Sequence, residues 1–150
     1  MSPVDLAMSF RAPIFVTVAY FGLYYTFLFG QSLSKYYVNA RERENAKKSG
    51  NKKESFRNIK YFSSDPISLM GDRTVGNMLE QQMPFLSALW LHAIFVDPAA
   101  AAHYGWFYIA TRAPYPLLFY IGSPWNLLST IPNYICIFLL LKGVVANSMP

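Results

Sequence analysis

Two sets of polar side chains recur at helical spacing in a chain that is otherwise strongly apolar. The first set lies at intervals of four, seven and eight residues from its first member: Arg73, Asn77, Glu80 and Gln81. The second set lies at intervals of four, eight and eleven residues: Tyr104, Tyr108, Arg112 and Tyr115. In an α-helix this spacing places each set on one face. Guanidinium, carboxylate and phenol groups gathered in this way could bind an anionic or zwitterionic ligand.

The composition excludes an ordinary water-soluble domain and a disordered chain. The 150 residues are 53% hydrophobic, 17% aromatic and only 14% charged, whereas soluble domains carry about 25% charged residues. Disordered chains need the opposite balance of hydrophobicity and charge. The length fits one domain. We therefore expect residues 1–150 to form a single integral membrane domain.

Hydropathy and turn signals predict four membrane-spanning helices, over residues 12–34, 72–96, 99–121 and 127–146. The first contains an uncharged run from Ala12 to Gly30, which is close to the ~20 residues needed to cross a bilayer and long for a cleaved signal peptide. Asp97 and Pro98 predict a helix start directly after the second span, and residues 122–124 make the next connection equally short. Short connections make neighbouring helices antiparallel. The expected fold is therefore an all-α, four-helix, up-and-down membrane bundle.

Residues 35–60, between the first two spans, are expected to form a basic loop. They hold nine of the 13 Lys and Arg residues and three Glu residues, a net charge of +6. The positive-inside rule predicts that this loop faces the cytosol. The expected location of the protein is the membrane of the endoplasmic reticulum or of another organelle. Residues 47–53 are expected to be solvated and mobile, and the ends of the loop could lie along anionic lipid headgroups. No nucleic-acid partner is expected, because the basic residues lack interleaved aromatic residues.

The orientation of the spans brings the two polar faces together. The second span leaves the basic loop and the third returns toward it, so both polar faces lie in the same leaflet. We expect Glu80 to pair with Arg112 or Arg73, which leaves the other guanidinium available for an anionic ligand. Prolines such as Pro84 and Pro114 free nearby backbone carbonyls. In the alternative interpretation, Arg73, Asn77 and Glu80 only lock helices together, while Tyr108 and Arg112 extend to the membrane interface.

The remaining candidates for chemistry do not form a recognisable site. His92 and His103 have no third ligand at metal spacing, so no metal is expected. The single cysteine, Cys136, excludes an internal disulfide and fits a small apolar core residue.

Residues 72–122 resemble the MAPEG family, the membrane-associated proteins of eicosanoid and glutathione metabolism. The pattern R-x3-N-x2-E-x3-P-F from Arg73 to Phe85 is similar to the second helix of that family, and residues 98–122 are similar to its third. The resemblance implies a homotrimer that binds glutathione between subunits as a substrate, with a lipophilic small molecule entering from the bilayer. By position it assigns three residues of the second helix and two of the third to glutathione binding: Arg73, Asn77, Glu80, Arg112 and Tyr115.

The function that this resemblance implies is a glutathione-dependent transferase or peroxidase acting on a lipophilic electrophile. In the family, an arginine at the start of the fourth helix stabilises the glutathione thiolate, whereas this chain has no Lys or Arg between Ala113 and Leu141. The catalytic residue is therefore unassigned. The alternative function is a non-catalytic member that binds membrane lipid or serves as a scaffold subunit of a larger membrane complex.

Overall fold

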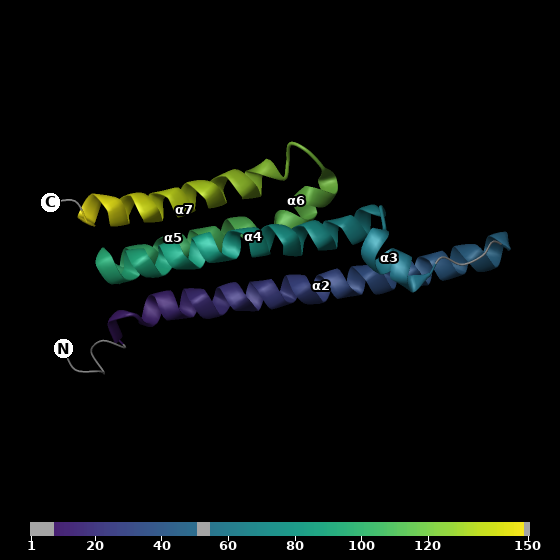
Figure 1. Cartoon of the computed structure of the whole chain (residues 1–150), viewed down its shortest axis with the longest axis horizontal. Helices are drawn as coiled ribbons and strands as arrows, with labels where there is room; N and C mark the ends of the chain where they lie inside the picture. The colour runs from purple at the N-terminus through teal and green to yellow at the C-terminus, as the bar shows by residue number, and fades with distance from the viewer. Residues whose placement is uncertain (1–7, 51–54, 149–150) are drawn as a thin grey trace.

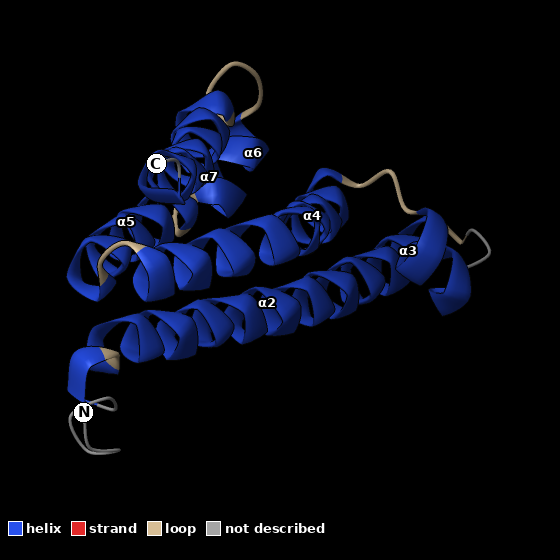
Figure 2. Ribbon diagram, turned by 60° about the vertical axis from the view of Figure 1, so that its left-hand side comes forward, coloured by secondary structure: helices blue, strands red, loops and turns tan. Residues whose placement is uncertain are grey.

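The structure, a computed structural model, describes residues 8–50 and 55–148 as a bundle of antiparallel helices without strands. The long helices are α2 (Arg11–Ser49), α4 (Pro66–Phe95), α5 (Pro98–Arg112) and α7 (Leu127–Ser148), and the short ones are α3 (Phe56–Phe62) and α6 (Tyr115–Ile121). Successive long helices reverse direction, so α2 begins and α7 ends at the same end of the bundle (Figure 1). Helix α4 lies between α2 and α7 (Figure 2). The all-α, up-and-down bundle predicted from the sequence is confirmed.

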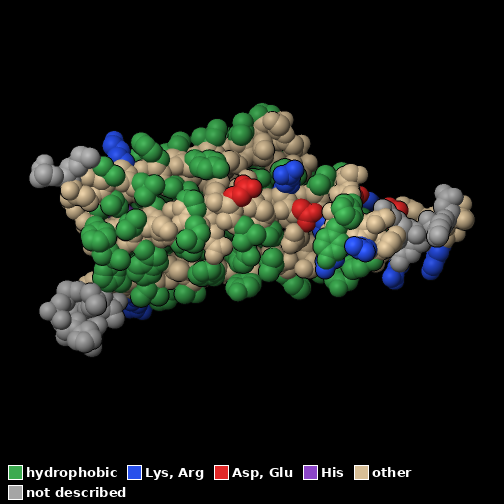
Figure 3. All heavy atoms as spheres, in the orientation of Figure 1, with side chains coloured by type: hydrophobic (Ala, Val, Ile, Leu, Met, Phe, Trp, Pro, Cys, Tyr) green, Lys and Arg blue, Asp and Glu red, His purple; other side chains and the backbone are tan. Residues whose placement is uncertain are grey.

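Apolar side chains cover the outside of the bundle as well as its core. Among the described helices, α2 and α7 have the length and the apolar composition needed to cross a membrane. Figure 3 shows hydrophobic side chains over most of one face, with Lys and Arg gathered mainly toward the end that carries α3. Helix α4 contains charged residues and α5 has 15 residues, fewer than the ~20 of a full span. Membrane crossing by these two central helices stays a prediction.

Three aromatic rings form the centre of the core where α2, α4 and α5 meet. Phe85 and Tyr108 stack with ring centroids 3.8 Å apart, and Tyr20 lies against both rings, at 5.3 and 6.2 Å. All three side chains are completely buried. This packing fixes the depth at which the polar residues of α4 and α5 face each other.

The predicted basic loop over residues 35–60 is wrong, because most of the segment that the structure describes is helical. Helix α2 continues as one helix of 39 residues to Ser49. Residues 40–48 are rich in Ala, Glu, Lys and Arg, which favour helix. Gly50 ends the helix with φ 67°, a left-handed conformation that suits glycine. Residues 47–49 are helical and exposed, and the mobility expected for residues 47–53 stays a prediction. Residues 51–53 lie outside the described residues.

Helix α4 begins at Pro66, not at the predicted residue 72. Asp65 caps it by accepting a hydrogen bond from the Ile67 backbone N–H at 3.0 Å, and Pro66 occupies the first turn. Asp65 also forms an ion pair with Arg41 of α2, and this hydrogen bond raises the pKa of the Arg41 guanidinium. The extension of α2 is thereby joined to the start of α4.

The third predicted span, residues 99–121, is divided into two helices. As predicted, Asp97 caps α5 and Pro98 stands in its first turn, with the Asp97 carboxylate 2.7 Å from the Ala100 amide. The helix ends at Arg112, and α6 starts at Tyr115. Pro114 and Pro116 have no backbone N–H to continue the helical ladder. This break places Tyr115 beside α4, with which α6 is in contact.

We expect Gly105→Ala to destabilise the bundle, because α5 packs closely against α2 and α4 at this residue. An added methyl group would overlap Cγ1 of Val16 and lie 3.1 Å from Cδ1 of Leu89. Overpacking of this kind costs about 1–3 kcal/mol, which thermal unfolding of the purified protein in detergent measures. Gly22→Ala is the matched control, because its methyl group would meet no atom within 4 Å. Equal melting temperatures for the two variants would contradict the tight packing at Gly105.

Candidate functional site

Asn77 of α4 is the centre of a hydrogen-bond network that joins α4, α5 and α6. Its side-chain oxygen accepts hydrogen bonds from Nη2 of Arg112 at 2.5 Å and from Nε2 of Gln81 at 3.2 Å. Its side-chain nitrogen donates to the Tyr115 hydroxyl at 3.1 Å. The Arg112 guanidinium lies 4.7 Å from the centroid of the Tyr115 ring, a cation–π contact. Three of the five predicted site residues are therefore in direct contact.

The network extends inward through Gln81 to the aromatic core. The Tyr108 hydroxyl donates to Oε1 of Gln81 at 2.9 Å, and the Tyr20 hydroxyl donates to the backbone carbonyl of Met78 at 3.3 Å. Gln81 is 1% exposed, so this layer is sealed from solvent. The side chain of Gln81 and the hydroxyls of Tyr20 and Tyr108 all have hydrogen-bond partners, as buried polar groups generally must.

A groove of about 650 Å³ lies outside this network, between α4 and α6. The residues that line it are mostly charged, amide or aromatic: Leu69, Asp72, Arg73, Gly76, Asn77, Glu80, Tyr115 and Phe119. Figure 3 shows acidic and basic side chains in the middle of an otherwise apolar face. Four of the five predicted site residues line the groove, and two of these, Asn77 and Tyr115, also belong to the buried network.

Arg112 does not line the groove, and its expected ion pair with Glu80 is not formed. The guanidinium is completely buried behind Asn77 and Tyr115. Within residues 8–50 and 55–148 the ion pairs are Lys35–Asp72 and Arg41–Asp65, so the expected Arg73–Glu80 pair is also wrong. Arg73 and Glu80 are seven residues apart, which separates them by about 10 Å along α4. Both residues are exposed.

The alternative in which these residues only lock helices together is correct for part of the set. Asn77, Arg112 and Tyr115 do connect α4 to α5 and α6. Arg112 and Tyr108 do not extend to the membrane interface as that alternative expected, because both are completely buried. Arg73 and Glu80 take no part in the network and face the groove. The candidate site therefore has an inner layer, which is the hydrogen-bond network, and an outer layer of charged side chains that face the groove.

The charges of the two layers are suited to a zwitterionic ligand. Arg73 can bind a carboxylate, while Glu80 can bind an ammonium group. The buried Arg112 has no hydrogen-bond partner for Nε or Nη1 among the described residues. Its charge is not balanced by a carboxylate in direct contact, which favours an anion at the neighbouring end of the groove. The Tyr115 hydroxyl accepts from Asn77, so its own proton is available to such an anion.

The start of α7 contributes polar side chains, but none of those described lines the groove. Ser129 is completely buried and its hydroxyl has no hydrogen-bond partner among the described residues. Asn133, one turn further along, accepts from the Thr111 hydroxyl at 2.7 Å. Asn133 thereby connects α7 to α5, away from the groove. The polar side chain that lines the groove from outside α4 is Tyr115 of α6.

Sequence reasoning missed the contributions of Leu69, Asp72, Gly76 and Phe119 to the groove. Asp72 lies beside Arg73 on α4, so helical spacing from Arg73 could not place it on the same wall. Phe119 lies four residues after Tyr115, one helical turn along α6. The proline-induced break before Tyr115 was the available signal that this turn would change direction and cover α4.

The MAPEG family model matches residues 15–146 of the chain. The matched region includes all of α4, α5 and α6 together with most of α2 and α7. It therefore contains every residue of the buried network and of the groove. No curated protein in the comparison matches the chain significantly. Because the family match covers nearly the whole bundle, the chain belongs to the MAPEG family.

Proposed function

We propose that this protein is a glutathione-dependent transferase or peroxidase that acts on a lipophilic electrophile in the membrane. MAPEG proteins are integral membrane helical bundles that typically use glutathione. The observation that carries the proposal is the groove in which Arg73, Glu80, Asn77 and Tyr115 face a common space.

Glutathione suits this groove because its charges match those of the outer layer. The tripeptide has two carboxylates, one ammonium group and one thiol, and an extended tripeptide spans about 10 Å. Arg73 and Glu80 are separated by a similar distance along α4. In the proposed complex Arg73 binds a carboxylate and Glu80 binds the ammonium group, so the thiol lies between them near Asn77 and Tyr115.

Activation of the thiol is assigned to the Tyr115 hydroxyl, supported by Arg112. A free thiol has a pKa of about 8.5 and is mostly protonated at neutral pH. Each unit by which the site lowers that pKa needs about 1.4 kcal/mol of stabilisation of the thiolate. The Tyr115 hydroxyl can donate to the sulfur, because its oxygen already accepts from Asn77. Arg112 acts as a positioning residue that holds Asn77 and adds positive charge behind the ring.

The electrophile would reach the groove from the lipid. Leu69 and Phe119 supply apolar wall on either side of the polar residues. In a transfer reaction the thiolate forms a carbon–sulfur bond and the leaving group departs with its electron pair. In a peroxidase reaction two glutathione molecules reduce a hydroperoxide to an alcohol and water and are oxidised to the disulfide.

Titration of glutathione into the purified full-length protein in detergent tests this proposal. We expect saturable binding accompanied by an increase in thiolate absorbance at neutral pH. S-methylglutathione is the matched ligand control, because it keeps the charged groups and has no ionisable thiol. It should bind without the absorbance change. A folded protein that binds neither ligand and turns over no generic electrophile would refute the proposed function.

A non-catalytic member that binds lipid is the second candidate. It is favoured by the lack of Lys and Arg between Ala113 and Leu141, since a neutral donor stabilises a thiolate less than a cation does. This candidate predicts glutathione binding without thiolate formation, or no glutathione binding together with stable lipid retention. The same titration therefore separates the two candidates.

A further inference from the structure

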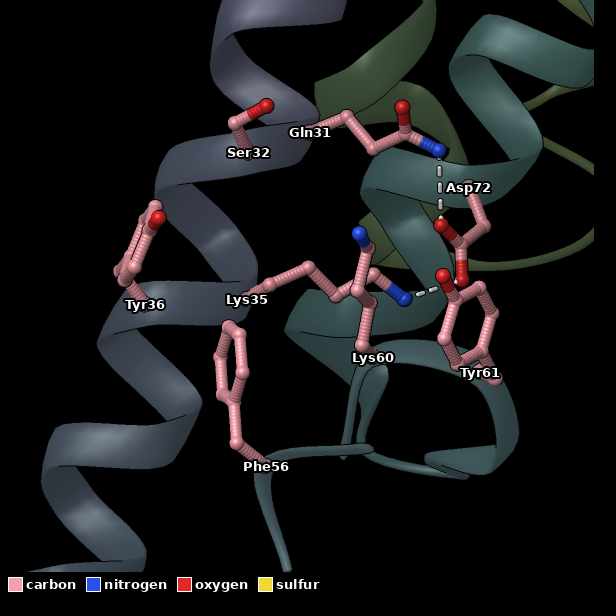
Figure 4. Close-up of a pocket in the computed structure, with 8 residues that line it drawn as sticks. All are labelled: Gln31, Ser32, Lys35, Tyr36, Phe56, Lys60, Tyr61 and Asp72. Atoms are coloured by element: carbon pink, nitrogen blue, oxygen red, sulfur yellow. Dashed lines mark hydrogen bonds and ion pairs between the residues drawn. The ribbon is translucent and has the colours of Figure 1, made fainter. Parts of the chain in front are cut away.

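A second pocket, which shares only Asp72 with the groove, lies where α2, α3 and the start of α4 meet. It has a volume of about 410 Å³, within the range of small-molecule pockets. Figure 4 shows its side chains arriving from three helices, with Lys35 from α2 and Lys60 from α3 on the same side as Asp72 of α4. The remaining wall is polar and aromatic: Gln31, Ser32, Tyr36, Phe56 and Tyr61.

The one carboxylate in this pocket is already engaged, which leaves a net positive charge. Asp72 accepts from Nε2 of Gln31 at 2.8 Å and from Nζ of Lys35 at 2.5 Å. Lys35 is 7% exposed and also donates to the Ser68 hydroxyl at 2.7 Å. An ammonium group has three N–H donors, so one remains on Lys35. Lys60 forms no ion pair within residues 8–50 and 55–148, and its Nζ lies 5.2 Å from the centroid of the Tyr61 ring.

The pocket lies at the depth of lipid headgroups. The uncharged part of α2 runs from Ala12 to Ser34, which is about 34 Å of helix and longer than the ~30 Å hydrocarbon core. Lys35 is the first charged residue after it. The headgroup layer on each side of a bilayer is about 5–8 Å thick. Tyr36 and Phe56 stack at 5.6 Å and hold α3 against α2, and aromatic rings of this kind are typical of the membrane interface. The opening therefore faces headgroups and not the hydrocarbon core.

We propose that this pocket binds the phosphate group of an anionic phospholipid from the leaflet beside α3. Lysine binds phosphate as a point charge, and basic pockets between membrane helices bind anionic headgroups. Lys60 and the remaining donor of Lys35 contact the phosphate, while Tyr36 and Phe56 pack against the glycerol carbons. The phosphate ion itself has the same chemistry, so the experiment includes it as a separate arm.

Lipid binding to the purified full-length protein in detergent tests this assignment by native mass spectrometry. The probes are phosphatidic acid and phosphatidylcholine of matched acyl chains. We expect the wild type to prefer phosphatidic acid by about tenfold, and Lys60→Gln to remove most of that preference. Arg57→Gln is the matched control, because it makes the same charge change on α3 at a residue that does not line the pocket. It should leave the preference unchanged.

Equal losses in Lys60→Gln and Arg57→Gln would assign the preference to general basic charge and would overturn the pocket. Competition with inorganic phosphate identifies the source of the ligand. Partial displacement of phosphatidic acid only at high phosphate concentration supports a headgroup site. Tight binding of inorganic phosphate, with no preference for phosphatidic acid over phosphatidylcholine, would assign the pocket to a soluble phosphate and overturn the lipid assignment.

Discussion

Replacement of Tyr115 by Phe is expected to lower kcat about a hundredfold while leaving the affinity for glutathione nearly unchanged. Loss of one hydrogen-bond donor to a developing anion has effects of this size. The hydroxyl is the only part removed, and the ring stays packed beside Arg112. The pKa of the bound thiol should return toward ~8.5. A pH titration of thiolate absorbance in the complex measures this shift independently of turnover.

Tyr108→Phe is the matched control, because it also removes one phenolic hydroxyl from a tyrosine of the same network. Its hydroxyl donates to Gln81 at 2.9 Å and does not line the groove. We expect this variant to lose about 1 kcal/mol of stability and to keep the pKa of the bound thiol. Equal effects of the two substitutions on that pKa would show that Tyr115 acts only through the fold.

The helical faces that carry the site could be predicted from residue spacing alone. Arg73, Asn77 and Glu80 share one face of α4 by periodicity, and Asp97 followed by Pro98 correctly marks the start of α5. These features depend on local rules, namely 3.6 residues per turn and the capping of free amides. The contact of Asn77 with both Arg112 and Tyr115 then follows once α4 and α5 are antiparallel.

The direction of each charged side chain could not be predicted, because it depends on packing between helices. Arg112 shares a helical face with Tyr108, yet the end of α5 at Ala113 turns the chain and buries the guanidinium behind Tyr115. The sequence makes Arg112 one of two possible partners of Glu80, but the actual partner of Arg112 is Asn77. Glu80 is exposed on α4, where no described residue forms an ion pair with it.

The boundaries of the helices on either side of residues 35–60 were predicted incorrectly, although a capping signal for α4 is present in the sequence. Asp65 and Pro66 repeat the pattern that marks the start of α5 at Asp97 and Pro98, and they do begin α4. Hydropathy predicts a later start for α4, because hydropathy indicates where a chain enters the membrane and not where a helix begins. Helix α2 extends beyond its apolar run for the same reason. Helix boundaries and membrane boundaries are set by different physical properties.

Arg73 and Glu80 are expected to recognise opposite charges at the two ends of glutathione, and ligand analogues can test each contact separately. An analogue without the α-amino group should bind the wild type about tenfold more weakly, which is the effect expected for a lost charge-assisted hydrogen bond. Glu80→Ala should bind glutathione with a similar loss. If Glu80 binds the amino group, Glu80→Ala should bind the analogue as tightly as it binds glutathione. Calorimetric titration in detergent gives all four binding constants.

The same design applies to Arg73 with an analogue whose glycine carboxylate is replaced by a carboxamide. Arg73→Ala and the carboxamide should each weaken binding by about tenfold, and the two losses should not add when the contact is direct. Arg43→Ala is the control, because it removes an exposed guanidinium from the helical extension of α2, away from the groove. Fully additive losses for Arg73 would mean that the guanidinium acts on glutathione only through long-range charge. Arg73 and Glu80 lie about 10 Å apart along α4, so glutathione must be extended to contact both of them. If the losses are additive for only one of the two residues, that residue does not contact glutathione directly.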